Sequence, residues 1–321
     1  NELIANGLLY SGSSVTFGVY AKDFFATGSV WLNDKIQAGV GKTQPVAQKT
    51  LTAYRRYCDK ILIPYFARYK LFDIKPYHIK QFRSFMLNKK YSNSAINIAC
   101  VCLKIILNYA LADGLIKENP FISISQMYIN ARSKSAFTKN QLKEVFAKDW
   151  ESLEYRKLFS LIAAVTGMRI GEISSLRKEN IYPTYIDIQD QLIDNQIMPV
   201  KDGEKRKVCI CKSLYNLLMK NTQSNGFMFN ENQDTYRQTF YQFAGLTLEK
   251  RKETQLSFHS IRHFFNTFLL TNNIAEIKVK TIMGHSSGKG SMTERYANFM
   301  PEDFNDIVVL QEMLIKEFLG N

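Results

Sequence analysis

The chain has 321 residues, of which 45% are hydrophobic and 22% are charged, and its formal net charge at pH 7 is +13. This length predicts two domains, and the composition is that of an ordinary globular protein, which excludes disordered and fibrous classes. No uninterrupted apolar run reaches the roughly 18 residues that cross a bilayer, and nothing near Asn1 resembles a signal peptide. We therefore expect a cytoplasmic protein with no membrane partner.

The positive charge is concentrated in the first part of the chain. Residues 1–136 hold 18 Lys and Arg against 7 Asp and Glu, whereas residues 137–321 hold 24 against 22. A basic module with few acids beside it fits a domain held against a polyanion such as duplex DNA. On charge alone, a merely well-solvated basic domain remains an equal alternative.

The five cysteines do not form a pattern that is typical of a metal site. Five is an odd number, and the two close pairs have the spacing C-x-C, whereas zinc ligands favour C-x-x-C. We expect small buried thiols in a reducing compartment, and no metal. The residues concerned are Cys58, Cys100, Cys102, Cys209 and Cys211.

The first part of the chain reads as a small, basic, all-helical bundle over residues 15–127, after an extension over residues 1–14. Apolar residues recur at helical spacing, and they predict four helices over residues 15–40, 46–69, 75–89 and 92–113. Asp113-Gly114 is a helix stop. Basic residues off the apolar stripes are candidates for contacts with the DNA backbone, although a solvated face explains each of them equally well. They are Arg55, Arg56, Lys80 and Arg83.

Residues 128–137 break this periodicity, and we interpret them as a linker to a second domain over residues 138–321. Thr138 and Gln141 have the spacing of a capping box. Strands are expected near 180–188, 195–200 and 206–211, with Asp202-Gly203 as a hairpin turn between the last two. Helices are expected over residues 139–148, 152–166, 212–222, 233–247, 257–272, 274–284 and 302–319.

Three segments of the second part carry groups suited to phosphodiester chemistry. Attack on a phosphodiester builds negative charge on oxygen, so the reaction needs fixed cations, a nucleophile, a base and an acid. Arginine suits the cation role because its planar fork pairs with two oxygens and stays charged. The segments are TGMRIGEI at 166–173, HSIRH at 259–263, and MGHSS at 283–287 followed by ERY at 294–296.

In this order and at these separations the motifs resemble the tyrosine recombinase, or phage integrase-like, family over residues 138–300. The resemblance implies a mainly α fold: an all-α core-DNA-binding bundle and a mostly α catalytic domain with a small antiparallel sheet, joined as a C-shaped clamp around DNA. It implies site-specific cleavage and religation of DNA through a 3′-phosphotyrosine, without a metal or other cofactor.

The resemblance also assigns the cations of the site. Arg169 and Arg262 resemble the two arginines that hold the scissile phosphate. Lys201 resembles the family's mobile lysine, the general acid for the departing 5′ oxygen, although Lys205 and Lys207 lie nearby and remain alternatives. From the residues alone, Arg169 could instead be a structural ion-pair partner of a nearby glutamate.

The remaining roles fall on two histidines and a tyrosine. His259 resembles the histidine that hydrogen-bonds the phosphate and accepts the proton of the tyrosine, and it shares a helix face with Arg262. His285 resembles the last phosphate-contacting donor, and Tyr296 resembles the nucleophile. A buried structural histidine is the alternative reading of His259 and His263.

The expected partners are duplex DNA and further copies of the chain. The family implies a homotetramer on two DNA sites with exchange of the C-terminal helix 302–319, and an accessory DNA-bending protein is possible. Because Asn1 is not a start residue, we expect an integrase of a phage or mobile element that has lost an upstream arm-type domain. A Xer-type resolvase, a type IB topoisomerase and a non-catalytic DNA-binding regulator are the alternatives.

Overall fold

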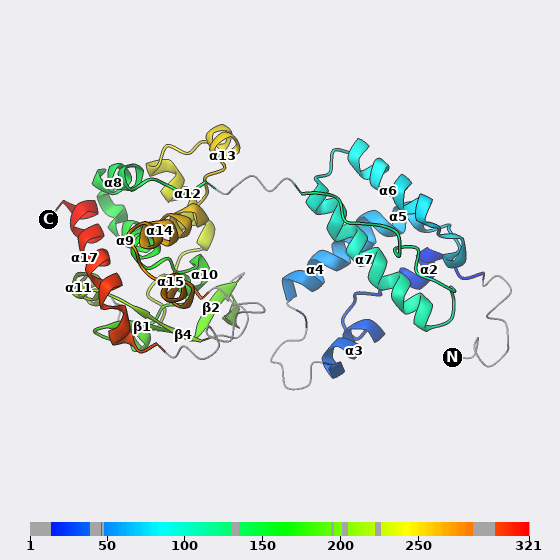
Figure 1. Ribbon diagram of the computed structural model, residues 1–321, viewed down its shortest axis with the longest axis horizontal. Coiled ribbons are helices and arrows are strands. Elements are labelled where there is room, and N and C mark those ends of the chain that lie inside the picture. The colour runs from blue at the N-terminus through cyan, green and yellow to red at the C-terminus, as the bar shows by residue number, and fades with distance from the viewer. Residues whose placement is uncertain are drawn as a thin grey trace. The chain divides into compact units, whose positions relative to one another are not determined.

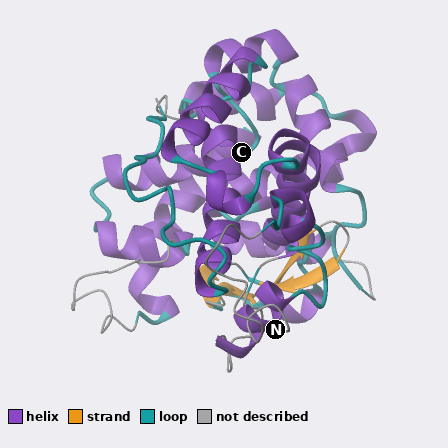
Figure 2. Cartoon of the chain, turned by 90° about the vertical axis from the view of Figure 1, so that its right-hand side faces the viewer, coloured by secondary structure: helices purple, strands orange, loops and turns teal. Residues whose placement is uncertain are grey.

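The computed structural model describes residues 14–38, 46, 48–129, 135–193, 196–200, 205–221, 226–284 and 299–320. The chain divides into two compact units, Asn1–Ala131 and Arg132–Asn321 (Figure 1). The division falls inside the segment 128–137. Helices dominate both units, and strands form only a small part of the chain (Figure 2), so the expected mainly α class is confirmed.

Helices are the main regular structure of the first unit, and α7 is its central helix. Helices α4 and α6 and the short π-helix before α5 (Cys58–Leu62) all pack against α7. By length and composition α7 could cross a membrane, but its apolar side chains form the core of this unit. The helices are α2 (Phe17–Ala21), α3 (Val30–Ala38), α4 (Gln48–Tyr57), α5 (Ile63–Phe66), α6 (Pro76–Asn88) and α7 (Asn93–Ala112).

The single helix expected over residues 15–40 is wrong, because the chain forms α2 and α3 with a turn between them. Asp23 (φ 56°) and Gly28 (φ 79°) adopt left-handed backbone conformations in that turn, which a continuing right-handed helix does not allow. The apolar residues of the segment still point inward, since Phe17, Phe25 and Trp31 are buried. The apolar spacing therefore predicted correctly which residues are buried, but it wrongly predicted one uninterrupted helix.

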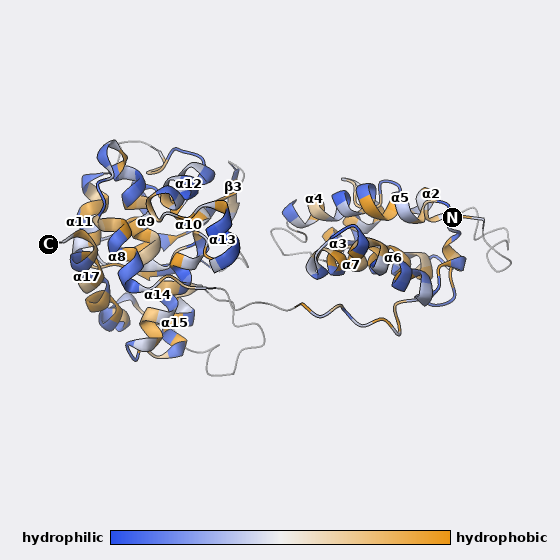
Figure 3. Cartoon of the chain, turned by 90° about the horizontal axis from the view of Figure 1, so that it is seen from above, coloured by the Kyte–Doolittle hydropathy of each residue, from blue (hydrophilic) through white to orange (hydrophobic). Residues whose placement is uncertain are grey.

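The second unit wraps helices around α9, which contacts α14 and α12 most extensively. Figure 3 shows α9 in the hydrophobic colour and the peripheral α13 mainly in the hydrophilic one. The helices are α8 (Lys139–Ala147), α9 (Glu154–Thr166), α10 (Ile170–Ser174), α11 (Lys212–Lys220), α12 (Gln233–Phe243), α13 (Leu248–Thr254), α14 (His259–Thr271), α15 (Glu276–Met283) and α17 (Asn305–Leu319). The expected capping box is present, because Thr138 and Gln141 exchange hydrogen bonds at the start of α8.

The described strands form two separate antiparallel pairs, and the expected hairpin between 195–200 and 206–211 is wrong. The strands are β1 (Tyr185–Ile188), β2 (Asp190–Ile193), β3 (Gln196–Pro199) and β4 (Arg206–Cys209). β1 pairs with β4, and β2 pairs with β3. The additional strand β2 was not expected, and it takes the place beside β3 that the sequence assigned to β4.

The C-terminal helix α17 packs on its own unit. It lies against α8, α11 and α9, and it buries Ile307, Leu314 and Phe318. Two ion pairs join it to the same unit, Lys139–Glu317 at 3.1 Å and Lys278–Asp306 at 2.8 Å. All five cysteines are buried and free, as expected.

Candidate active site

The sharp turn between α9 and α10 places the first arginine. Gly167 ends α9 in a left-handed conformation (φ 65°), and a side chain there would meet Met283 Sδ at 2.5 Å. Arg169 then stands immediately before α10, and its backbone N–H donates to Glu172 Oε2 at 2.8 Å. Only glycine allows both the turn and the close approach of α15.

The second arginine comes from α14, where His259 is the first helical residue and Arg262 lies one turn later. Arg262 is 3% exposed, and His259 is exposed. The guanidinium of Arg262 donates to the carbonyl oxygen of Gly167 at 2.5 Å and to that of Met283. These contacts join α14 to the turn after α9 and to the end of α15.

The carboxyl end of α15 gathers three guanidinium groups. Arg206 Nε donates to the carbonyl of Ile282 at 3.0 Å, Arg262 donates to that of Met283, and Arg169 Nη2 donates to that of Gly284 at 2.6 Å. A helix end leaves its last carbonyls without intrahelical partners and carries partial negative charge, so it attracts cations. Three consecutive carbonyls thereby fix three arginines from three different elements.

One buried carboxylate stands among these cations. Glu172, whose side chain is 1% exposed, accepts from Arg169 Nη1 at 2.8 Å and from both terminal nitrogens of Arg206, at 2.9 and 2.7 Å. Three arginines and one glutamate leave an excess of positive charge. The ion pair considered for Arg169 thus exists, but it occupies only part of that guanidinium.

The surroundings lower the pKa values of both Glu172 and Arg262 within this cluster. Burial alone would raise the pKa of Glu172, but hydrogen bonds and charge from Arg206 and Arg169 outweigh it and hold that pKa at about 2. Burial lowers the pKa of Arg262, and the nearby charges of Arg169 and Arg206 lower it further. The cluster therefore carries a net positive charge, which a bound phosphate would neutralise.

The low pKa of Glu172 predicts a stability contribution that depends on pH. A carboxyl group whose pKa is lowered by folding stabilises the native state above its unfolded pKa, and this contribution is lost as the pH falls through the folded pKa. We expect Glu172→Gln to lower the melting temperature, with the largest difference from wild type near neutral pH. Below the ordinary carboxyl pKa of about 4.3, this difference in melting temperature should shrink as the pH approaches 2. A difference that does not change with pH in thermal melts would contradict this.

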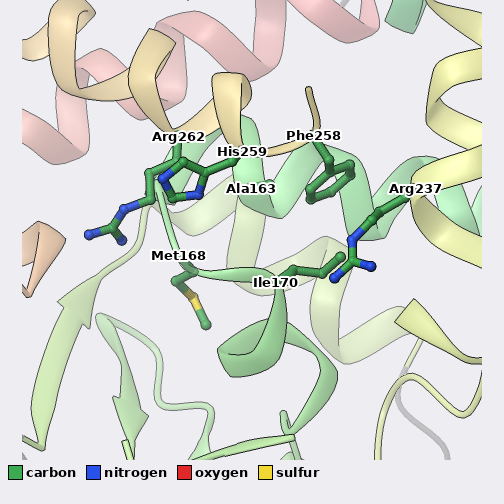
Figure 4. Close-up of a pocket in the computed structure, with 7 residues that line it drawn as sticks. All are labelled: Ala163, Met168, Ile170, Arg237, Phe258, His259 and Arg262. Atoms are coloured by element: carbon green, nitrogen blue, oxygen red, sulfur yellow. The ribbon is translucent and has the colours of Figure 1, made fainter. Parts of the chain in front are cut away.

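A pocket of about 230 Å³ lies beside the cluster. Figure 4 shows Arg262 and His259 close together on one side of it and Arg237, from α12, on the other. The wall between them is apolar and includes Met168, Ile170 and Phe258. The pocket thus has arginines on two sides, of which Arg237 is paired with Asp234, and an apolar wall between them.

Comparison with known proteins identifies the chain. A family model described as the phage integrase family matches residues 135–302, which is more than half of the chain. The chain belongs to the phage integrase family. A phage integrase SAM-like domain also matches residues 29–127, within the first unit.

Curated relatives are about a fifth identical to the chain over the aligned residues. The ICEBs1 integrase of Bacillus subtilis is 22% identical over 76% of this chain and 72% of its own length. The tyrosine recombinase XerC of Listeria monocytogenes is 23% identical over 76% of this chain and 83% of its own length. The chain is a tyrosine recombinase, an enzyme of site-specific DNA recombination, as its motifs indicate.

Solved structures establish the fold of the recombinase. A lambda integrase dimer bound to a COC′ core site aligns with a TM-score of 0.64 and 17% identity, covering 94% of this chain and 83% of that one. The Tn1549 transposon integrase in complex with a circular intermediate DNA also aligns with a TM-score of 0.64, at 20% identity over 88% of this chain and 96% of that one.

The structure brings together the expected Arg169, His259 and Arg262. Lys201, His285 and Tyr296 lie outside the described residues. Two further arginines of the site, Arg206 and Arg237, stand in no motif: Arg206 reaches the site through its contact with Glu172, and Arg237 lines the pocket from α12. An isolated arginine at the start of a short strand carries no local signal that its partner is 34 residues away.

The basic residues expected to contact DNA differ in their setting. Arg55, Arg56 and Lys80 are exposed on α4 and α6. Arg83 is half-buried, and its Nε is buried without a hydrogen-bond partner among the described residues. Burial raises the pKa of the Cys100 thiol, and a hydrogen bond from Arg83 opposes that rise, so Arg83 points partly into its own unit.

Proposed function

We propose that this recombinase integrates and excises a mobile genetic element by cutting and rejoining duplex DNA through a 3′-phosphotyrosine at Tyr296. The observation that carries the proposal is the convergence of Arg169 and Arg262 on the carbonyl oxygens of Met283 and Gly284. The relatives named integrase support the integrative role.

The two arginines would bind the non-bridging oxygens of the scissile phosphate. A guanidinium has five N–H donors, and the contacts with described residues engage two nitrogens of each arginine, so donors remain for a ligand. Their placement is fixed before DNA arrives, which is what electrostatic stabilisation of a transition state requires. His259, exposed at the rim of the same pocket, would add a hydrogen bond to the phosphate.

The remaining roles rest on the family motifs. The phenol oxygen of Tyr296 would attack phosphorus and lose its proton to His259, while the bond to the 5′ oxygen breaks and that oxygen takes a proton from Lys201. His285, the residue after Gly284, would add a further donor to the phosphate. Because the phosphotyrosine keeps the energy of the phosphodiester, the reverse attack by a 5′ hydroxyl reseals DNA without a nucleotide cofactor.

The first unit would act as the core-DNA-binding domain. Its exposed Arg55, Arg56 and Lys80 would contact backbone phosphates, so binding should weaken steeply with salt. The lambda integrase structure contains a core site, which supports this mode of binding. We place the reaction in the cytoplasm, and propose an accessory DNA-bending protein as an optional partner.

Four copies acting on two DNA sites would complete the exchange of strands. A lambda integrase tetramer bound to a Holliday junction aligns with a TM-score of 0.60, which supports this assembly. We propose that α17 docks on a neighbouring copy in the assembled state. Because identical copies present identical grooves, the apolar contacts that Ile307, Leu314 and Phe318 make on their own unit can be remade between copies.

A nicked suicide substrate that carries the repeats bounding the element tests the proposal. Wild type should accumulate a covalent protein–DNA adduct that resists denaturant, because the released fragment cannot return for ligation. The absence of an adduct would favour a DNA-binding regulator. Relaxation of a supercoiled plasmid lacking the repeats would favour a type IB topoisomerase, and activity only on chromosomal dimer sites would favour a Xer-type resolvase.

A further inference from the structure

All three guanidinium nitrogens of Arg206 are engaged inside the protein. Its two terminal nitrogens contact Glu172 at 2.9 and 2.7 Å, its Nε donates to the Ile282 carbonyl at 3.0 Å, and its side chain is 8% exposed. Arg169 and Arg262, by comparison, each have two of their three guanidinium nitrogens engaged by described residues. Arg206 is therefore placed to organise the cluster and has fewer donors left for a phosphate.

We infer that Arg206 is a positioning residue for strand cleavage, which acts through Glu172 to hold Arg169 toward the phosphate. The inference rests on the proposed function. The chain of contacts is continuous, because the Glu172 carboxylate that receives Arg206 also accepts from the backbone and side chain of Arg169. Arg206 thus links β4 to the start of α10.

Charge sharing explains why a third arginine is needed. Glu172 alone with Arg169 would form a one-to-one ion pair that neutralises the cation intended for the phosphate. With Arg206 bound to both carboxylate oxygens, the negative charge is divided between two guanidinium groups. The positive charge of Arg169 is then only partly neutralised and can act on DNA. The fixed Glu172 carboxylate holds the orientation of the Arg169 side chain.

Arg206 also fixes the end of α15. Gly284 adopts φ 57°, and a side chain there would come within 2.8 Å of the Arg206 guanidinium. The guanidinium therefore packs directly on the backbone whose carbonyl binds Arg169. Two contacts of Arg169, one to Glu172 and one to Gly284, depend on the position of Arg206.

The test compares the rate of adduct formation on the suicide substrate with DNA affinity. Arg206→Met should slow single-turnover adduct formation about 100-fold, the scale expected for a displaced catalytic group, while the Kd for the same uncleaved duplex stays near wild type. Arg206→Lys, which keeps the charge but not the fork, should recover part of the rate. In the double variant with Glu172→Gln the losses should be less than additive, because both act on one contact.

Arg156→Met is the matched control, since Arg156 also makes a bidentate pair with a glutamate in the same unit. Its nitrogens contact Glu231 at 2.7 and 2.5 Å, away from the α15 carbonyls. This variant should lose thermal stability and keep the wild-type rate of adduct formation per folded molecule. Equal rate losses for Arg156→Met and Arg206→Met would reduce Arg206 to a purely structural residue and overturn the inference.

The pH profile separates positioning from stability. Among the described residues, the charged groups that face Glu172 are Arg169 just before α10, Arg206 on β4 and Arg262 on α14. Removing Arg206 should raise the pKa of Glu172, so the rate for Arg206→Met should fall further below neutral pH, and Glu172→Gln should abolish this added dependence. An unchanged profile, or a loss of DNA affinity as large as the loss of rate, would overturn the inference. If wild type itself forms no adduct, the proposed function fails instead.

Discussion

Tyr296→Phe is expected to abolish the covalent protein–DNA adduct and leave DNA affinity nearly unchanged. The substitution deletes the hydroxyl that would attack phosphorus and keeps the aromatic ring, so the ground-state contacts with DNA remain. Denaturing gel electrophoresis of the suicide-substrate reaction measures the adduct, and a mobility-shift titration of the same duplex measures the affinity.

Each of the other 16 tyrosines serves as a control for this assignment. Tyr155 is suitable because its hydroxyl is bonded inside the second unit, to Met228 and Tyr236, and plays no part in the chemistry. Tyr155→Phe should form the adduct. Retained adduct in Tyr296→Phe, with loss in another tyrosine variant, would show that the nucleophile lies elsewhere.

Arg262→Met should slow adduct formation about 1000-fold, which is the upper range for loss of one preorganised donor to a developing anion. It should also destabilise the fold, since the carbonyls of Gly167 and Met283 lose their partner in a buried place, at about 1–3 kcal/mol for each unsatisfied group. Rates must therefore be normalised to folded protein by circular dichroism at the assay temperature.

Arg262→Lys distinguishes charge from geometry. A single ammonium cannot reach both carbonyls and a phosphate at once, so we expect little recovery of the rate of adduct formation although the positive charge is kept. If Arg262→Lys matches wild type in rate, then general positive charge is sufficient and the bidentate role is wrong.

Helical periodicity and short motifs predicted the parts of the structure that local sequence decides. The helices of both units follow their apolar spacing, and the motifs gave Arg169, His259 and Arg262, which the structure brings together. The helix predicted to end at residue 166 does end there, because Gly167 is the residue type that favours a left-handed cap.

Pairings between distant segments were not predictable in this way. The strands are four residues each, so their alternation is too short to specify a partner, and the Asp202-Gly203 signal favoured a hairpin that β2 replaced. Arg206 was missed for a related reason, since its role depends on Glu172 in α10 and on the end of α15. The break between α2 and α3 was not predicted, because the spacing of apolar residues does not show where the backbone adopts a left-handed conformation.

The acceptors at the end of α15 are main-chain oxygens, which every amino acid carries. Residues 282 and 283 can therefore change their side chains without moving the arginines, provided that they still fill the core, whereas Gly284 cannot gain a side chain. A one-residue insertion in α15 would rotate these oxygens by about 100° about the helix axis and point them away from their donors. Helix length, more than residue identity, is what evolution must preserve here.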